Sequence, residues 1–152
     1  MSVEQLLHEL NWLQRRLYES YREYNTTQDN LGSEKLKDHF YQQAAQRKEY
    51  YEEIRERIKQ LDEIPADVTR PFGDAADEIF TDLKTLFSGE DDRLILQEVK
   101  VVEQKLLRAY DQVLEVPEVS PVLRQALERQ RGEVKRDFDM AAEELARLDG
   151  KA

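Results

Sequence analysis

The chain has 152 residues, a formal net charge of −10 and no cysteine. This length suits one domain, because a chain of about 150 residues buries roughly two-thirds of the surface that its unfolded form exposes. The acids are spread along the sequence, and no stretch gathers Lys and Arg with aromatic residues, so we expect no nucleic-acid binding. The lack of cysteine excludes disulfides and thiolate chemistry. No membrane span is expected, since no run approaches about 20 apolar residues. No signal peptide is expected either, because residues 1–10 lack a basic start, an apolar core and a small-residue cleavage site.

Four long segments carry apolar residues at every third or fourth position, the spacing of amphipathic helices. Ser2 and Ser33 are candidate caps, and Gly32 directly before Ser33 predicts a tight antiparallel hairpin between the first two helices. Pro65 ends the second helix, and Ser120 followed by proline begins the last. The predicted helices cover residues 2–30, 34–61, 74–87, 90–114 and 121–148.

The segment between the two hairpins, residues 62–89, is much longer than an ordinary helix connection. Its length suits an extended stretch followed by the short helix at 74–87, which would return along the bundle. The helices at 34–61 and 90–114 would then be parallel. The sequence therefore predicts a single all-α domain over residues 1–152, a ferritin-like four-helix bundle with a long crossover.

Short runs follow one another in a fixed order between residues 46 and 117: Gln46–Arg47, Leu61–Pro65, Phe80–Lys84, Ser88–Asp92, Glu98–Glu103, Tyr110 and Leu114–Pro117. In this order they resemble the bacterial ferritin-like four-helix-bundle proteins catalogued as domain-of-unknown-function family 2383. The chain departs from that family at Phe80, where a tryptophan is usual, and at Val102, where a glycine is usual. The resemblance implies a ferritin-like fold and a protein of the bacterial cytoplasm.

Ferritin-like oxidases hold two metal ions with glutamates and Glu-x-x-His pairs, because one helical turn brings a carboxylate and an imidazole together. Neither His8 nor His39 follows a glutamate by three residues, and we expect about 25 Å between them along the bundle. A carboxylate-only site for iron or manganese is the alternative. Its candidate ligands are Glu19, Glu23, Glu49, Glu53, Glu103, Glu133 and Asp137. All but Glu103 lie beside the apolar stripes, where exposure to solvent is expected.

Three polar residues interrupt the apolar stripes near mid-length of their helices: Arg47, Glu103 and Gln130. Our hypothesis is that Arg47 and Glu103 form a buried ion pair with Gln130 nearby, in the space where ferritins hold iron. The alternative is that Arg47 lays its aliphatic stem on the stripe and extends its charge outward to water.

The sequence contains no Ser-His-Asp set, phosphate-binding loop or zinc motif, so no catalytic residue and no cofactor are assigned. We expect a non-catalytic bundle that acts through protein contacts or self-association, for example as a homodimer. Trp12, Tyr18, Tyr21 and Tyr50 are candidate interface residues if they are exposed together. The alternative is a ferritin-like di-metal oxidase or storage protein that uses iron or manganese.

Overall fold

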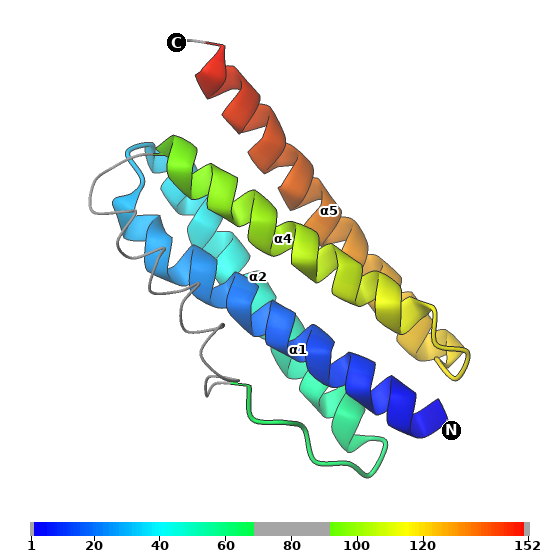
Figure 1. Cartoon of the computed structure of the whole chain (residues 1–152). Helices are drawn as coiled ribbons and strands as arrows, with labels where there is room; N and C mark the ends of the chain where they lie inside the picture. The colour runs from blue at the N-terminus through cyan, green and yellow to red at the C-terminus, as the bar shows by residue number, and fades with distance from the viewer. Residues whose placement is uncertain (1, 69–91, 151–152) are drawn as a thin grey trace.

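A computed structural model describes residues 2–68 and 92–150. These residues form four long helices and one short 3-10 helix: α1 (Ser2–Thr27), η1 (Gln28–Asn30), α2 (Glu34–Lys59), α4 (Asp92–Leu114) and α5 (Pro121–Asp149). The described part of the chain contains no strand, and the predicted all-α four-helix bundle is confirmed (Figure 1). The predicted helix at 74–87 and the first two residues of the one at 90–114 lie outside the described residues.

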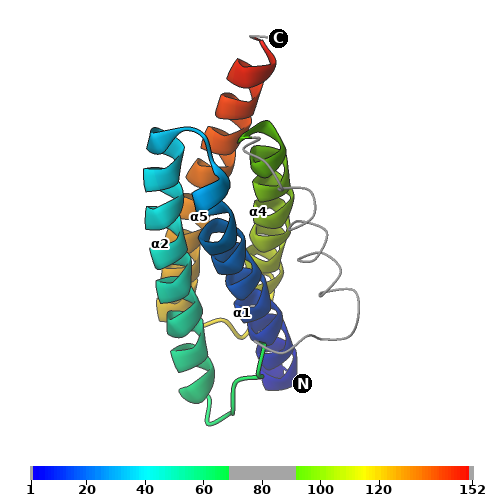
Figure 2. The same cartoon turned by 90° about the vertical axis from the view of Figure 1, so that its left-hand side faces the viewer.

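The four helices form two antiparallel hairpins, and α1 lies between α2 and α4 (Figure 2). Helices α2 and α4 run in the same direction, as the ferritin-like topology requires (Figure 1). Asp92, the first residue of α4, accepts hydrogen bonds from the backbone N–H groups of Gly32 (2.7 Å) and Ser33 (3.2 Å). The carboxylate of Asp92 therefore ties the start of α4 to the turn between α1 and α2.

Serine caps fix the start of two helices. The Ser33 hydroxyl accepts from the Leu36 N–H at the start of α2, and the Ser120 hydroxyl accepts from the Leu123 N–H at the start of α5, both at 3.2 Å. Each bond satisfies one of the N–H groups that a helix start leaves without an intrahelical partner. Both caps lie where the sequence predicts them.

The chain leaves α2 through a turn and folds back on α1. Asp62 has a φ of 60°, in the left-handed region that reverses the chain direction. Beyond it, Asn11 accepts from the Ala66 N–H at 3.0 Å, while Gln14 and Arg55 donate to the Ala66 carbonyl at 3.1 and 2.9 Å. These bonds hold residues 65–68 against the side of α1.

The core consists of two apolar clusters separated along the bundle. The first is built around Leu10, Leu13 and Ile54, and the second around Leu31, Phe40 and Ile95, all at most 1% exposed. Two details differ from the expected stripes. The apolar spacing places Val3 and Tyr51 inward, but Val3 is 50% exposed and Tyr51 is only half-buried, with its ring centre 5.6 Å from that of Tyr18. Tyr50 is buried instead, at 6%. No helix in the described part of the chain is long and apolar enough to cross a bilayer.

Candidate functional site: a buried polar layer

The two apolar clusters are separated by a layer of polar side chains, one or more from each long helix. Its centre is Arg47 of α2, which is 0% exposed. The Arg47 Nη2 donates to Glu103 Oε2 of α4 at 2.5 Å and to Asp137 Oδ2 of α5 at 2.7 Å. The Arg47 Nε donates to the Ser20 hydroxyl of α1 at 3.1 Å. One guanidinium group therefore links all four helices.

The remaining bonds of the layer complete the pairing of Arg47 and Glu103. The Arg47 Nη1 donates to Gln46 at 2.5 Å, and the Ser20 hydroxyl donates to Glu103 Oε1 at 2.5 Å. The guanidinium also lies 5.6 Å from the centre of the Tyr24 ring, within the range of a cation–π contact. Both oxygens of Glu103 and all three nitrogens of the Arg47 guanidinium are thus hydrogen-bonded.

The protonation states of Arg47 and Asp137 depend on their burial and on the neighbouring charges. Burial by itself would lower the pKa of Arg47, but Glu103 and Asp137 outweigh it and raise that pKa, so the guanidinium stays charged. Burial raises the pKa of Asp137 to about 6 although the contact with Arg47 opposes the shift. At neutral pH the layer therefore holds one fixed cation between two carboxylates.

Glu23 lies at the edge of the layer and, unlike Glu103 and Asp137, accepts no hydrogen bond from Arg47. Its side chain is 1% exposed, and neither carboxyl oxygen has a hydrogen-bond partner among the described residues. Burial, and then the nearby charges of Glu98 and Glu103, raise the pKa of Glu23 to about 8. The carboxyl of Glu23 is therefore mostly protonated and neutral at pH 7.

Gln130 is buried, but the structure pairs it with Tyr110 and not with Arg47. The Tyr110 hydroxyl donates to Gln130 Oε1 at 2.7 Å, and Gln130 Nε2 has no partner among the described residues. Burial raises the pKa of Tyr110 well above its usual range, which keeps the phenol protonated as the donor. Of the three residues grouped from the sequence, the structure brings Arg47 and Glu103 together and places Gln130 in a separate pair.

The acids proposed as alternative metal ligands are scattered. Glu53 pairs with Arg129 at 3.3 Å, Glu133 pairs with Arg136, and Glu49 is exposed. Glu19 is only 6% exposed and pairs with Arg16 at 2.9 Å. Among the described residues, none of these four acids forms a hydrogen bond or an ion pair with Arg47.

The expectation of solvent exposure is wrong for Glu19, Glu23 and Asp137, which are 6%, 1% and 9% exposed. Helix α1 packs on both α2 and α4, so its buried face is wider than a single stripe and takes in the two glutamates. On α5, Asp137 lies one turn after the buried Val134 and turns toward Arg47. The three acids are therefore part of the interior.

These residues do not fit a di-metal centre. The oxygens of Glu103 and Asp137 that face mid-bundle already accept from Arg47, and its positive charge occupies the space where two cations would lie. His8 and His39 line different hollows, and the one beside His39 has a volume of about 10 Å³, no more than one water needs. Within residues 2–68 and 92–150, no group of three or more His, Asp or Glu side chains is arranged to hold a metal ion.

The helix order, the parallel α2 and α4 and the polar layer at mid-bundle define a ferritin-like four-helix bundle. The chain belongs to the family described as Domain of unknown function (DUF2383), whose model matches residues 5–116. The family prediction is therefore confirmed.

The structure is also similar to a crystal structure described as "ferritin like, diiron-carboxylate proteins from Bacillus anthracis str. Ames". The TM-score is 0.60 at 16% sequence identity, with 98% of this chain and 96% of that chain covered. At this identity the similarity shows the shared fold alone. Among curated proteins, no sequence matches this chain.

Proposed function

We propose that this protein is a non-catalytic bundle of the bacterial cytoplasm that acts through contacts with other proteins or with a second copy of itself. The observation that carries the proposal is the Arg47 guanidinium, fully buried and hydrogen-bonded to Glu103 and Asp137 at mid-bundle. In this position Arg47 supplies the positive charge that a metal supplies in a diiron-carboxylate bundle.

Arginine suits this position for a physical reason. A cluster of buried carboxylates needs a positive charge inside the bundle, because an unpaired buried carboxylate is costly. The guanidinium group remains protonated when buried and offers several donors in one plane. The chain can therefore complete its interior with its own side chains.

The burial of the layer also argues against catalysis there. Arg47 and Glu103 are 0% exposed and Glu23 is 1% exposed, so a substrate has no approach to these groups in this conformation. Acid–base chemistry requires the group to come within hydrogen-bond reach of the substrate. We therefore assign the layer a structural role and look for function on the surface.

The alternative is a ferritin-like di-metal oxidase or storage protein that uses iron or manganese. The similar crystal structure is described as a diiron-carboxylate protein, which is the observation in favour of this alternative. In the present chain, such a site would draw on Glu23, Glu103 and Asp137 and would require the Arg47 side chain to leave the interior. We favour the metal-free bundle because the guanidinium group forms hydrogen bonds with three of the four long helices in addition to its own.

The test is elemental analysis of protein purified without chelators from cells grown with added iron and manganese. We expect far less than one metal ion per chain in the wild type. The variant Arg47→Ala is the matched sample, because it removes the guanidinium and leaves the acids in place. Two metal ions per wild-type chain would refute the proposal in favour of the oxidase or storage protein.

A further inference from the structure

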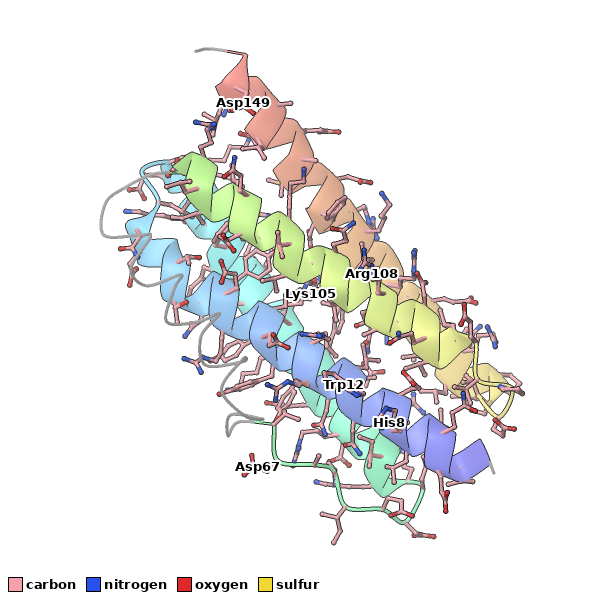
Figure 3. The ribbon with its side chains drawn as sticks, viewed as in Figure 1. His8, Trp12, Asp67, Lys105, Arg108 and Asp149 are labelled. Atoms are coloured by element: carbon pink, nitrogen blue, oxygen red, sulfur yellow. The ribbon has the colours of Figure 1, made fainter. Side chains whose placement is uncertain are left out.

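A groove between α1 and α4 is the most distinctive surface of the described chain. Trp12 and Arg16 of α1 and Lys105 and Arg108 of α4 line a hollow of about 360 Å³. Trp12 also lines a second hollow of about 390 Å³, together with His8 and Asn11. In Figure 3, His8 and Trp12 on α1 and Lys105 and Arg108 on α4 lie along the same side of the bundle. We call the first hollow the α1/α4 groove; the second adjoins it at Trp12 and lies between α1 and Ala66.

The groove is positive in a strongly acidic protein. Lys105 and Arg108 lie one turn apart on α4, and neither has an ion-pair partner among the residues that the structure describes. Arg16 adds a third cation on the opposite wall, although it pairs with Glu19 at 2.9 Å. The chain as a whole has 33 acids against 23 Lys and Arg. Three cations around one hollow, two of them without an ion-pair partner among the described residues, attract a negatively charged partner.

An exposed aromatic residue accompanies the charge. Trp12 is the only tryptophan of the chain and is 40% exposed. The Arg16 guanidinium lies 5.2 Å from the centre of its ring, so charge and apolar surface adjoin. The other candidate interface residues are packed: Tyr50 is 6% exposed, and Tyr18 and Tyr21 are half-buried with their ring centres 6.1 Å apart. Tryptophan and arginine are the residues most enriched among strong binding contacts in protein interfaces.

We propose that the α1/α4 groove docks an acidic segment of a partner protein, with an apolar side chain beside Trp12 and carboxylates beside Lys105 and Arg108. The proposal rests on the proposed function, since it names the surface through which the bundle makes its protein contacts. Charge complementarity selects this occupant. A two-fold dimer through the same face would bring Lys105 and Arg108 of both copies together and is disfavoured. A nucleic acid would be repelled by the net charge of −10.

The test uses Trp12 as its own reporter, because all tryptophan fluorescence of the chain comes from the groove. The probe is a synthetic amphipathic helix of about 18 residues with a Leu face and a Glu face, about five turns long. It is titrated into the full-length protein at low salt. We expect a saturable change in Trp12 emission that weakens as salt is added, since salt screens exposed charges. The same peptide with Gln in place of every Glu is expected not to bind.

Two double variants with the same change in charge locate the binding. Lys105→Glu with Arg108→Glu makes the charge of the groove negative, and we expect this double variant to bind the Glu peptide about tenfold or more weakly. Lys35→Glu with Lys48→Glu makes the same change on α2, where both lysines are exposed and have no ion-pair partner in the described part of the chain. We expect this control to bind within about twofold of the wild type.

Three results would overturn the proposal that the α1/α4 groove docks an acidic segment. The first is no binding of the Glu peptide. The second is an equal loss in both double variants. The third is a Trp12 that acrylamide cannot quench in the free protein, because the groove would then already be covered, by residues 69–91 of the same chain or by a second copy. The metal content of the same sample is measured separately. Stoichiometric metal would refute the proposed function, whereas failed docking in metal-free protein would refute this inference alone.

Discussion

The middle of the bundle and its two ends are held together by different physics. At the ends, apolar side chains such as Leu13 and Ile95 gain stability from burial, which depends little on direction. At mid-bundle, Arg47, Glu103 and Asp137 require defined distances and angles, because a buried charge without its partner is costly. The apolar ends explain why the helices associate. The polar layer explains why they associate in one register, since a shift of any helix would separate the guanidinium from its acceptors.

Replacing Arg47 by methionine tests this difference most severely. The Arg47→Met variant keeps an unbranched side chain but leaves Glu103 and Asp137 without their cation, so we expect a loss of about 3 to 5 kcal/mol in the free energy of unfolding. Leu13→Met is the matched change in an apolar end and should cost less than about 1.5 kcal/mol. Urea unfolding at pH 7 measures both. Equal losses in the two variants would show that the layer is no more demanding than the ends.

Glu23 provides a test through pH. Its pKa is about 8 in the folded chain against an ordinary value of 4.5, so between these values the folded chain holds a proton that the unfolded chain has released. The free energy of unfolding should therefore fall as pH rises toward 8 and level off above it. Asp137, with a pKa of about 6, behaves in the same way at lower pH.

Between about pH 6.5 and about pH 8.5, Glu23 is the acid expected to release its proton in the folded chain. Over this range the free energy of unfolding should fall by about 1 to 2 kcal/mol less in the Glu23→Gln variant than in the wild type. Glu49→Gln changes an exposed acid of α2 in the same way and should keep the wild-type slope. Thermal or urea unfolding across the window gives the comparison. A wild-type slope in Glu23→Gln would contradict the protonated, buried carboxyl.

The pair between Tyr110 and Gln130 should matter less than the Arg47 contacts. The Tyr110→Phe variant removes the hydroxyl that donates to Gln130 at 2.7 Å and leaves a buried amide without its donor. We expect a loss of about 1 to 2 kcal/mol in the free energy of unfolding. No loss would indicate that Gln130 finds another partner in the interior.

We expect the smallest losses in the free energy of unfolding from the helix caps. Ser120→Ala removes the hydroxyl that accepts from the Leu123 N–H, and we expect it to cost about 1 kcal/mol. Ser33→Ala makes the same change at the start of α2 and should cost a similar amount. Urea unfolding measures both, and a loss as large as that of Arg47→Met would contradict the smaller contribution expected of the caps.

The fold was predictable because local signals and long-range packing agree. The serine before α2, the Ser-Pro pair before α5 and the apolar spacing each predict an element, and the long segment after α2 favours parallel α2 and α4. The exact helix ends were less accurate. Helix α1 ends at Thr27 and continues as the short η1, and α2 ends at Lys59.

The interior of the layer was predictable only in part. Arg47 and Glu103 interrupt apolar stripes, which is a signal that a single sequence can show. Glu23 and Asp137 lie beside their stripes, and their burial depends on the angle at which one helix faces two neighbours, which periodicity does not encode. Gln130 also interrupts a stripe, but its choice of Tyr110 over Arg47 depends on distances between helices.

The most direct test of the account is the energetic coupling between Arg47 and Glu103. The free energies of unfolding of Arg47→Met, Glu103→Leu and the double variant are compared with that of the wild type. If the two side chains fill mid-bundle as a bonded pair, the double variant should lose roughly 1 to 3 kcal/mol less than the sum of the single variants. Losses that simply add would contradict the pair, and with it the claim that an arginine takes the place of a metal at the centre of this bundle.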